Sequence, residues 1–152
     1  MEWGLNEVEI SFRQSIVLKS DYTEAHNNLG TTLKELGRLD EAEVSYTQAI
    51  SLKLDYAEAH SNLGNTLKEL GRLDESEASY RQAIALKPDY AEAHSNLGVT
   101  LQELLKLDEA EESCRQAIVL KPDHAKAYYN LGIILKELGR LDEAEVSFRQ
   151  AI

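Results

Sequence analysis

Residues 55–88 read DYAEAHSNLGNTLKELGRLDESEASYRQAIALKP, and residues 89–122 read DYAEAHSNLGVTLQELLKLDEAEESCRQAIVLKP. About three-quarters of the aligned positions are identical, which is more than a shared helical pattern would produce. The spacing of 34 residues runs through the whole chain, since it separates Asp21, Asp55, Asp89 and Asp123. A period of this length is typical of arrays in which one helical or mixed unit is copied and each copy packs on its neighbours.

The first half of each unit is predicted to be a helix. After Asp89, Leu97 and Leu101 recur at helical spacing, and Glu92 completes the pattern of a capping box, which predicts that Asp89 caps the helix. A left-handed turn is predicted after the helix in three copies, at Gly37, Gly71 and Gly139. Leu105 replaces this glycine in the third full copy, where a left-handed conformation costs roughly 1–2 kcal/mol.

The second half of each unit is predicted to be another helix. Its predicted caps are Asp40, Asp74 and Asp142, and its apolar stripe is Ala78, Tyr80, Ala83, Ile84 and Leu86. Pro88 or Pro122 closes the unit, because proline cannot continue a helix. Small residues recur in both helices, at Gly30, Gly64, Gly98 and Gly132 and at Ala49, Ala83, Ala117 and Ala151. They predict a close approach of the paired helices.

These patterns predict an all-α fold, a solenoid of antiparallel helix pairs that forms a single array over residues 1–152. The expected divisions are a half repeat at 1–20 that holds only the second helix, full repeats at 21–54, 55–88 and 89–122, and a truncated repeat at 123–152. Because both ends lie within a repeat and lack a polar capping helix, association of copies end to end is one possible outcome.

The charge balance bears on the class of partner. Sixteen basic and 27 acidic residues give a net charge of −11, which disfavours nucleic acid and anionic lipid and favours neutral or basic protein partners. No apolar run has the length needed to cross a membrane, so no membrane role is predicted. The lone Cys114 cannot form an internal disulfide, and the chain as given opens without a secretory signal, so a cytoplasmic location is expected.

The residues resemble tetratricopeptide repeats, whose 34-residue units carry Leu-Gly in the first helix, an alanine and an aromatic residue in the second, and a closing proline. Leu63-Gly64, Tyr80, Ala83 and Pro88 match this pattern, whereas Cys114 departs from it. The resemblance implies a right-handed superhelix in which the first helices line a concave groove. Runs such as HSNLG at 60–64 are most similar to the repeats of O-linked N-acetylglucosamine transferases, in which an asparagine ladder holds substrate peptides.

Candidate peptide-binding residues follow from that resemblance. The asparagine ladder corresponds to Asn28, Asn62, Asn96 and Asn130. A carboxamide both donates and accepts, which suits a peptide backbone, but the same amides could instead bond neighbouring helices to one another. Further groove residues implied by the family alignment are Asn65, Lys68, Gln102, Lys126, Tyr129 and Ile133. Val99, Tyr129 and Ile133 together predict an apolar pocket in the later repeats.

Another tetratricopeptide pattern, the carboxylate clamp for acidic chaperone tails, is disfavoured. Asn65, Asn96 and Lys126 occupy three of its positions, but Ser61 and Asn130 stand where the clamp needs lysine and arginine. The two missing cations would remove charge-assisted hydrogen bonds worth very roughly 1.5–3 kcal/mol each.

The sequence offers no pattern for catalysis, and no metal or other cofactor is expected. His26, His60 and His94 lie one repeat apart, too far to converge on one zinc ion, and are interpreted as packing residues. Cys114 is interpreted as buried filler. The leading function is a non-catalytic scaffold that binds an extended peptide or partner segment in its groove. The alternatives are a substrate-recruiting arm of a larger enzyme, such as a glycosyltransferase, and a module that assembles end to end.

Overall fold

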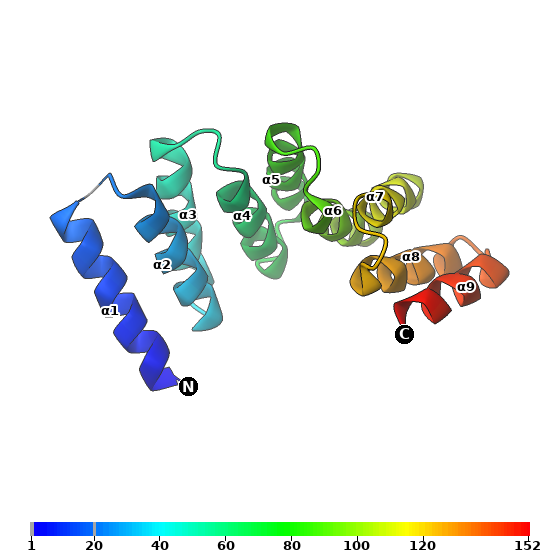
Figure 1. Cartoon of the computed structure of the whole chain (residues 1–152), viewed down its shortest axis with the longest axis horizontal. Coiled ribbons are helices and arrows are strands. Elements are labelled where there is room, and N and C mark those ends of the chain that lie inside the picture. The colour runs from blue at the N-terminus through cyan, green and yellow to red at the C-terminus, as the bar shows by residue number, and fades with distance from the viewer. Residues whose placement is uncertain (1, 20) are drawn as a thin grey trace. The chain divides into compact units, whose positions relative to one another are not determined.

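The computed structural model describes residues 2–19 and 21–152, and within these ranges every regular element is an α-helix (Figure 1). The helices are α1 (Glu2–Leu18), α2 (Thr23–Glu35), α3 (Leu39–Leu52), α4 (Ala57–Glu69), α5 (Leu73–Leu86), α6 (Ala91–Glu103), α7 (Leu107–Leu120), α8 (Ala125–Glu137) and α9 (Leu141–Ala151). The prediction of an all-α repeat fold is confirmed. None of the helices in the described ranges is long and apolar enough to cross a membrane.

The chain divides into two compact units, residues 1–72 and residues 73–152. In the first unit α1 packs on α2, α2 on α3, and α3 on α4. In the second unit α5 packs on α6, α6 on α7, α7 on α8, and α8 on α9, and α6 also contacts α8. In Figure 1 the two helices within each of the pairs α2–α3, α6–α7 and α8–α9 lie side by side. A short turn joins them, so the two helices of a pair are antiparallel.

The turn within each pair is the one predicted from glycine. Gly37 has φ of +75°, its N–H donates to the Lys34 carbonyl at 2.9 Å, and the Arg38 N–H donates to the Leu33 carbonyl at 2.9 Å. These two bonds satisfy carbonyls that the end of α2 leaves without a helical partner. Leu105 makes the same turn with φ of +61°, so a side chain occupies a left-handed position there.

The predicted side-chain caps are wrong. α6 begins at Ala91 and its N-cap residue is Tyr90, so Asp89 lies one position too early to cap it, and Tyr90 makes no side-chain cap bond. The chain instead enters the helix through a backbone turn, in which the Tyr90 N–H donates to the Lys87 carbonyl at 3.1 Å. The second helix of a pair also lacks its predicted cap. α3 begins at Leu39, which places Asp40 in the first turn of the helix rather than at its cap. There the carboxylate still faces the positive end of the helix dipole.

Glycine in the first helix makes room for the large residue of the second. A Cβ atom at Gly30 would lie 2.7–2.9 Å from the ring of Tyr46, and one at Gly132 would lie 2.6–2.9 Å from the ring of Phe148. Such distances are too short for real atoms, so the predicted close approach is confirmed. Ala83 is buried as expected, but Ala78 is exposed, and Ser76 takes the buried place on that helix.

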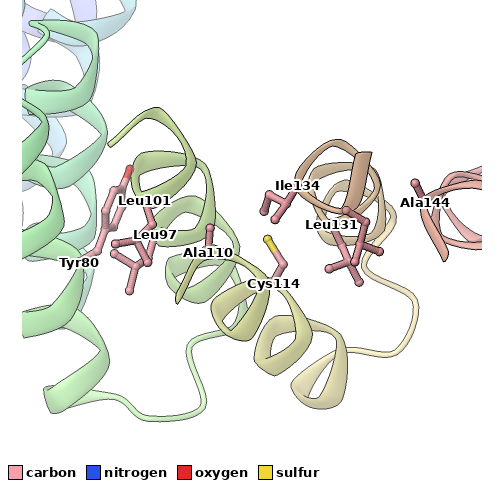
Figure 2. Close-up of a cluster of buried hydrophobic side chains, with 9 residues drawn as sticks. Tyr80, Leu97, Leu101, Ala110, Cys114, Leu131, Ile134 and Ala144 are labelled. Carbon is pink, nitrogen blue, oxygen red and sulfur yellow. The ribbon is translucent and has the colours of Figure 1, made fainter. Parts of the chain in front are cut away.

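Each unit has its own apolar cluster. That of the first unit is made of Leu29, Leu33, Ala42 and Tyr46, with Phe12, Ile16 and Leu63 packed against it. That of the second unit is made of Tyr80, Leu97, Leu101, Ala110, Cys114, Leu131, Ile134, Leu135 and Ala144. Figure 2 shows the Cys114 sulfur directed from α7 toward Ile134 of α8. Cys114 therefore fills the core position that Tyr46 fills in the first unit.

Ion pairs connect one helix pair to the next at the same positions in every repeat. Glutamates on the second helices contact cations in the following pair at Glu9–Arg38 (2.7 Å), Glu43–Arg72 (2.7 Å), Glu77–Lys106 (2.8 Å) and Glu111–Arg140 (2.6 Å). Each pair lies within one unit. Burial raises the pKa of Glu77, but hydrogen bonds from Lys106 and Arg81 outweigh burial, and the pKa lies below its ordinary value. Glu77 therefore stays ionised at neutral pH, and the four ion pairs support the stacking of successive helix pairs.

Candidate functional site

The first helices of the repeats are α2, α4, α6 and α8, and we call the side of a unit that they form its first-helix face. In the first unit this face carries part of the predicted asparagine ladder. Asn62 on α4 donates from Nδ2 to Oδ1 of Asn27 on α2 at 3.2 Å. Asn28 is exposed, whereas Asn62, Asn65 and Lys68 are half-buried. The amide of Asn62 thus bonds two neighbouring first helices and keeps part of its surface open to solvent.

The second unit repeats this bond and adds a cation. Asn130 on α8 donates from Nδ2 to Oγ of Ser95 on α6 at 3.2 Å, and both side chains are buried. Lys126, also on α8, donates from Nζ to Oδ1 of Asn96 at 3.0 Å. Asn96 is half-buried and Lys126 is exposed, so this second bond lies at the surface.

The four asparagines therefore differ in what they can offer to a ligand. Asn130 is a buried link between helices, which matches the alternative stated for the ladder, and Asn62 makes the same link while partly exposed. Asn28 and Asn96 retain accessible surface. The partners of these amides, Asn27 and Ser95, are themselves residues of the repeat period, one position before the ladder residue in the preceding repeat. That offset was the signal in the sequence that could have indicated the inter-repeat bond.

An exposed aromatic residue stands beside Lys126. Tyr129 is 54% exposed, and its ring lies 5.8 Å from that of Phe148 at an interplanar angle of 60°. A cavity of about 490 Å³ is lined by Lys126, Tyr129 and Phe148, together with Ala125, Ala151 and Ile152. This cavity has Tyr129 in its wall, but neither Val99 nor Ile133 lines it, so the apolar pocket expected from the three residues together stays a prediction.

The other predicted groove residues lie further along these helices. Gln102, at the end of α6, donates from Nε2 to Glu137 of α8 at 2.7 Å. Ile133 is half-buried on α8. In the first unit, Lys34 and Glu69 form an ion pair of 2.8 Å at the corresponding end of α2 and α4. This end of each first-helix face is thus occupied by contacts between repeats.

The contacts of His60, His94 and Cys114 hold the fold together. Nε2 of His60 lies 3.2 Å from the Leu54 carbonyl, and Nε2 of His94 lies 3.0 Å from the Pro88 carbonyl, so these imidazoles bond the loop before their own helix. Burial raises the pKa of Cys114 to about 12, which keeps the thiol protonated and unreactive at neutral pH. In the described part of the chain, no group of three or more His, Cys, Asp or Glu side chains is placed to hold a metal ion.

Helix pairs, glycine turns and first-helix faces of this kind define a helical-repeat protein, and the family comparison agrees. A model described as TPR repeat matches residues 30–71 and 64–104, and a second one, described as Tetratricopeptide repeat, matches residues 89–152. Together they span 30–152, and the chain belongs to the tetratricopeptide repeat family. They support tetratricopeptide repeats in general, not the narrower likeness to the repeats of O-linked N-acetylglucosamine transferases. A comparison with curated proteins gives no match.

Solved structures share the fold over most of the chain. MamA is 26% identical with a TM-score of 0.86, and the match covers 94% of this chain and 84% of MamA. YrrB, a TPR protein with an unusual peptide-binding site, is 21% identical with a TM-score of 0.80, covering 98% and 77%. The Pseudomonas aeruginosa protein pilF is 18% identical with a TM-score of 0.89, covering 98% and 69%.

Proposed function

We propose that this chain is a non-catalytic scaffold that binds an extended segment of a partner protein along its first-helix faces. The observation that carries the proposal is Tyr129, a large aromatic side chain that is 54% exposed beside Lys126 and a cavity of about 490 Å³. A large aromatic side chain that is already packed against a neighbouring ring loses little conformational entropy on binding. Such side chains often contribute most of the binding energy at protein interfaces. The peptide-binding site of YrrB, a protein of the same fold, is a precedent.

The surrounding groups suit a peptide in extended form. Lys126 offers N–H donors to backbone carbonyls or to a carboxylate, and Asn96 adds an amide next to it at 3.0 Å. Phe148 supports the Tyr129 ring from α9. The first unit offers amides of its own to a bound segment, from Asn28 and Asn62. Because the chain carries a net charge of −11, we expect the bound segment to be neutral or basic outside the contact with Lys126.

The test is a peptide-library selection against the intact chain and against matched variants. Tyr129→Ser introduces the residue found at the equivalent positions 61 and 95, and Lys126→Glu introduces that of positions 24, 58 and 92. These variants are expected to fold, which circular dichroism checks. Peptides that bind the wild type should lose affinity by about tenfold in Tyr129→Ser, since removing an interface anchor costs 1–2 kcal/mol or more.

The control is Val119→Ser, a substitution at an exposed position of a second helix that copies the residue at position 51. Peptides that bind through the first-helix face should bind this variant as they bind the wild type. Binding that Tyr129→Ser and Lys126→Glu leave unchanged would remove the proposal, as would a selection in which no peptide is enriched.

A further inference from the structure

Two cavities elsewhere in the chain have the same construction. One lies in the first unit among α1, α2 and α3, and the other lies in the second unit among α5, α6 and α7. Each has a volume of about 500 Å³. Their linings correspond position by position at a distance of two repeats, so that His26 matches His94 and Gln48 matches Gln116. The repeat geometry therefore forms a cavity of this kind between successive second helices.

The two cavities differ in charge. Val44 in the first cavity is replaced by Glu112 in the second, and Glu109 lines only the second. Arg81 in the wall of the second cavity is already compensated, because it bonds Glu109 at 2.7 Å and Glu77 at 2.8 Å. Glu112 is exposed and adds a negative charge that Arg81 does not offset. The lining of the second cavity therefore carries more acidic than basic charge.

Part of the remaining wall of the second cavity is apolar. Ile84 and Ala85 of α5 and Leu97 of α6 form this part, and His94, Ser113 and Gln116 complete the lining. The His94 Nε2 atom lies 3.0 Å from the Pro88 carbonyl, so this ring is fixed in place. An aliphatic chain that ends in a cation matches this lining, because its methylenes would pack on Ile84 and Leu97 while its head group meets Glu112.

We propose that the cavity among α5, α6 and α7 binds a lysine or arginine side chain from a basic segment of a partner protein. Charge complementarity selects this occupant over a neutral or acidic one, and the net charge of −11 favours its approach. The cavity uses second-helix residues, so this site is separate from the proposed peptide site and does not depend on it. The cavity of the first unit, with Val44 in place of the carboxylate, is the built-in counterpart that has no acidic side chain in its lining.

The test is a nuclear magnetic resonance titration of the intact chain with labelled isoleucine and leucine methyl groups. The probes are Nα-acetyl-lysine methylamide and Nα-acetyl-arginine methylamide, and the neutral control is Nα-acetyl-norleucine methylamide. Salt at about 0.15 M shortens the Debye length to roughly 8 Å and suppresses diffuse binding to the acidic surface. We expect saturable shifts at Ile84 and Leu97 with the two cationic probes and weaker ones with the neutral probe.

Glu112→Val, which copies the residue at position 44, should raise the Kd of the cationic probes by about 2- to 5-fold, the range for one exposed ion pair. The reciprocal Val44→Glu should make the Ile16 and Leu29 methyls respond to the same probes. His94→Tyr, which copies position 128, should fill the cavity and reduce the binding of every probe. The proposal is overturned if the cationic probes cause no shifts at Ile84 and Leu97, or if the norleucine probe causes equal shifts. It is also overturned if Glu112→Val leaves the shifts with the cationic probes unchanged.

Discussion

His124 stands just before α8, at the position that Tyr22, Tyr56 and Tyr90 occupy in the other copies. It is 8% exposed, and among the described residues its Nε2 atom has no hydrogen-bond partner. At the equivalent place, Lys87 Nζ lies 4.7 Å from the centroid of the Tyr90 ring. The histidine thus lacks a cation–π contact and buries an unpaired polar atom, which costs about 1–3 kcal/mol.

His124→Tyr is therefore expected to raise the free energy of unfolding by about 1 kcal/mol at neutral pH. Burial lowers the pKa of His124 below its ordinary 6.5, and Lys121 lowers it further. The unfolded chain then binds this proton more readily than the folded chain, so the wild type loses stability as the pH falls below about 6.5. Urea unfolding of both proteins between about pH 8 and pH 5 measures the difference, which should widen on acidification. Parallel profiles would contradict the assignment.

Gly98 shows how one missing methyl group fixes the distance between two helices. A Cβ atom there would lie 2.5 Å from the Cys114 sulfur and 3.2 Å from the Ala110 carbonyl oxygen. Gly98→Ala should lower the free energy of unfolding by about 1–3 kcal/mol through overpacking, although alanine favours a helix by about 1 kcal/mol. Chemical denaturation provides the measurement. Gly4→Ala is the control, since nothing lies within 4 Å of its Cβ position, and it should not destabilise the protein.

At the scale of elements, the turn between α6 and α7 is the one that departs from the repeat. Leu105 adopts φ of +61° and is 81% exposed, so it accepts left-handed backbone strain without burying its side chain. Leu105→Gly should raise the free energy of unfolding by up to about 1 kcal/mol, because relief of strain exceeds the added freedom of the unfolded chain. Thermal unfolding measures the change. Leu105→Ala keeps a Cβ atom and should gain little, so equal melting temperatures for the two variants would refute the strain argument.

The same elements show what the sequence could and could not predict. Helix pairing and the glycine turns were predictable, because periodicity and positive φ leave a direct trace in residue type, as at Gly37 and Gly71. The caps were not, because Asp89 has the right spacing to Glu92 but sits one residue outside the N-cap position that the backbone turn sets. Ion pairs such as Glu111–Arg140 connect different repeats, so a search within one repeat cannot find them.

The candidate site shows the same division between pattern and contact. The family resemblance indicated that Asn62, Asn130 and Tyr129 belong to first helices, and the structure places them on α4 and α8. It did not indicate that Asn130 is buried and bonded to Ser95, because burial depends on the neighbouring copy. The cavity among α5, α6 and α7 was not predicted either, since it forms from three helices whose side chains each look like ordinary surface or core.

At the scale of the whole molecule, charge governs how copies interact with one another. A net charge of −11 repels copies at neutral pH, and this repulsion disappears near the isoelectric point of about 4.8. The second virial coefficient from static light scattering should therefore be positive at about pH 7 in dilute salt and turn negative near pH 4.8. Glu24→Gln with Glu92→Gln reduces the net charge from −11 to −9, since two exposed acids are removed, and should move the crossing to higher pH. A coefficient that stays negative at pH 7 in dilute salt would mean that attraction between specific surfaces outweighs the net charge, and the repulsion argument would fail.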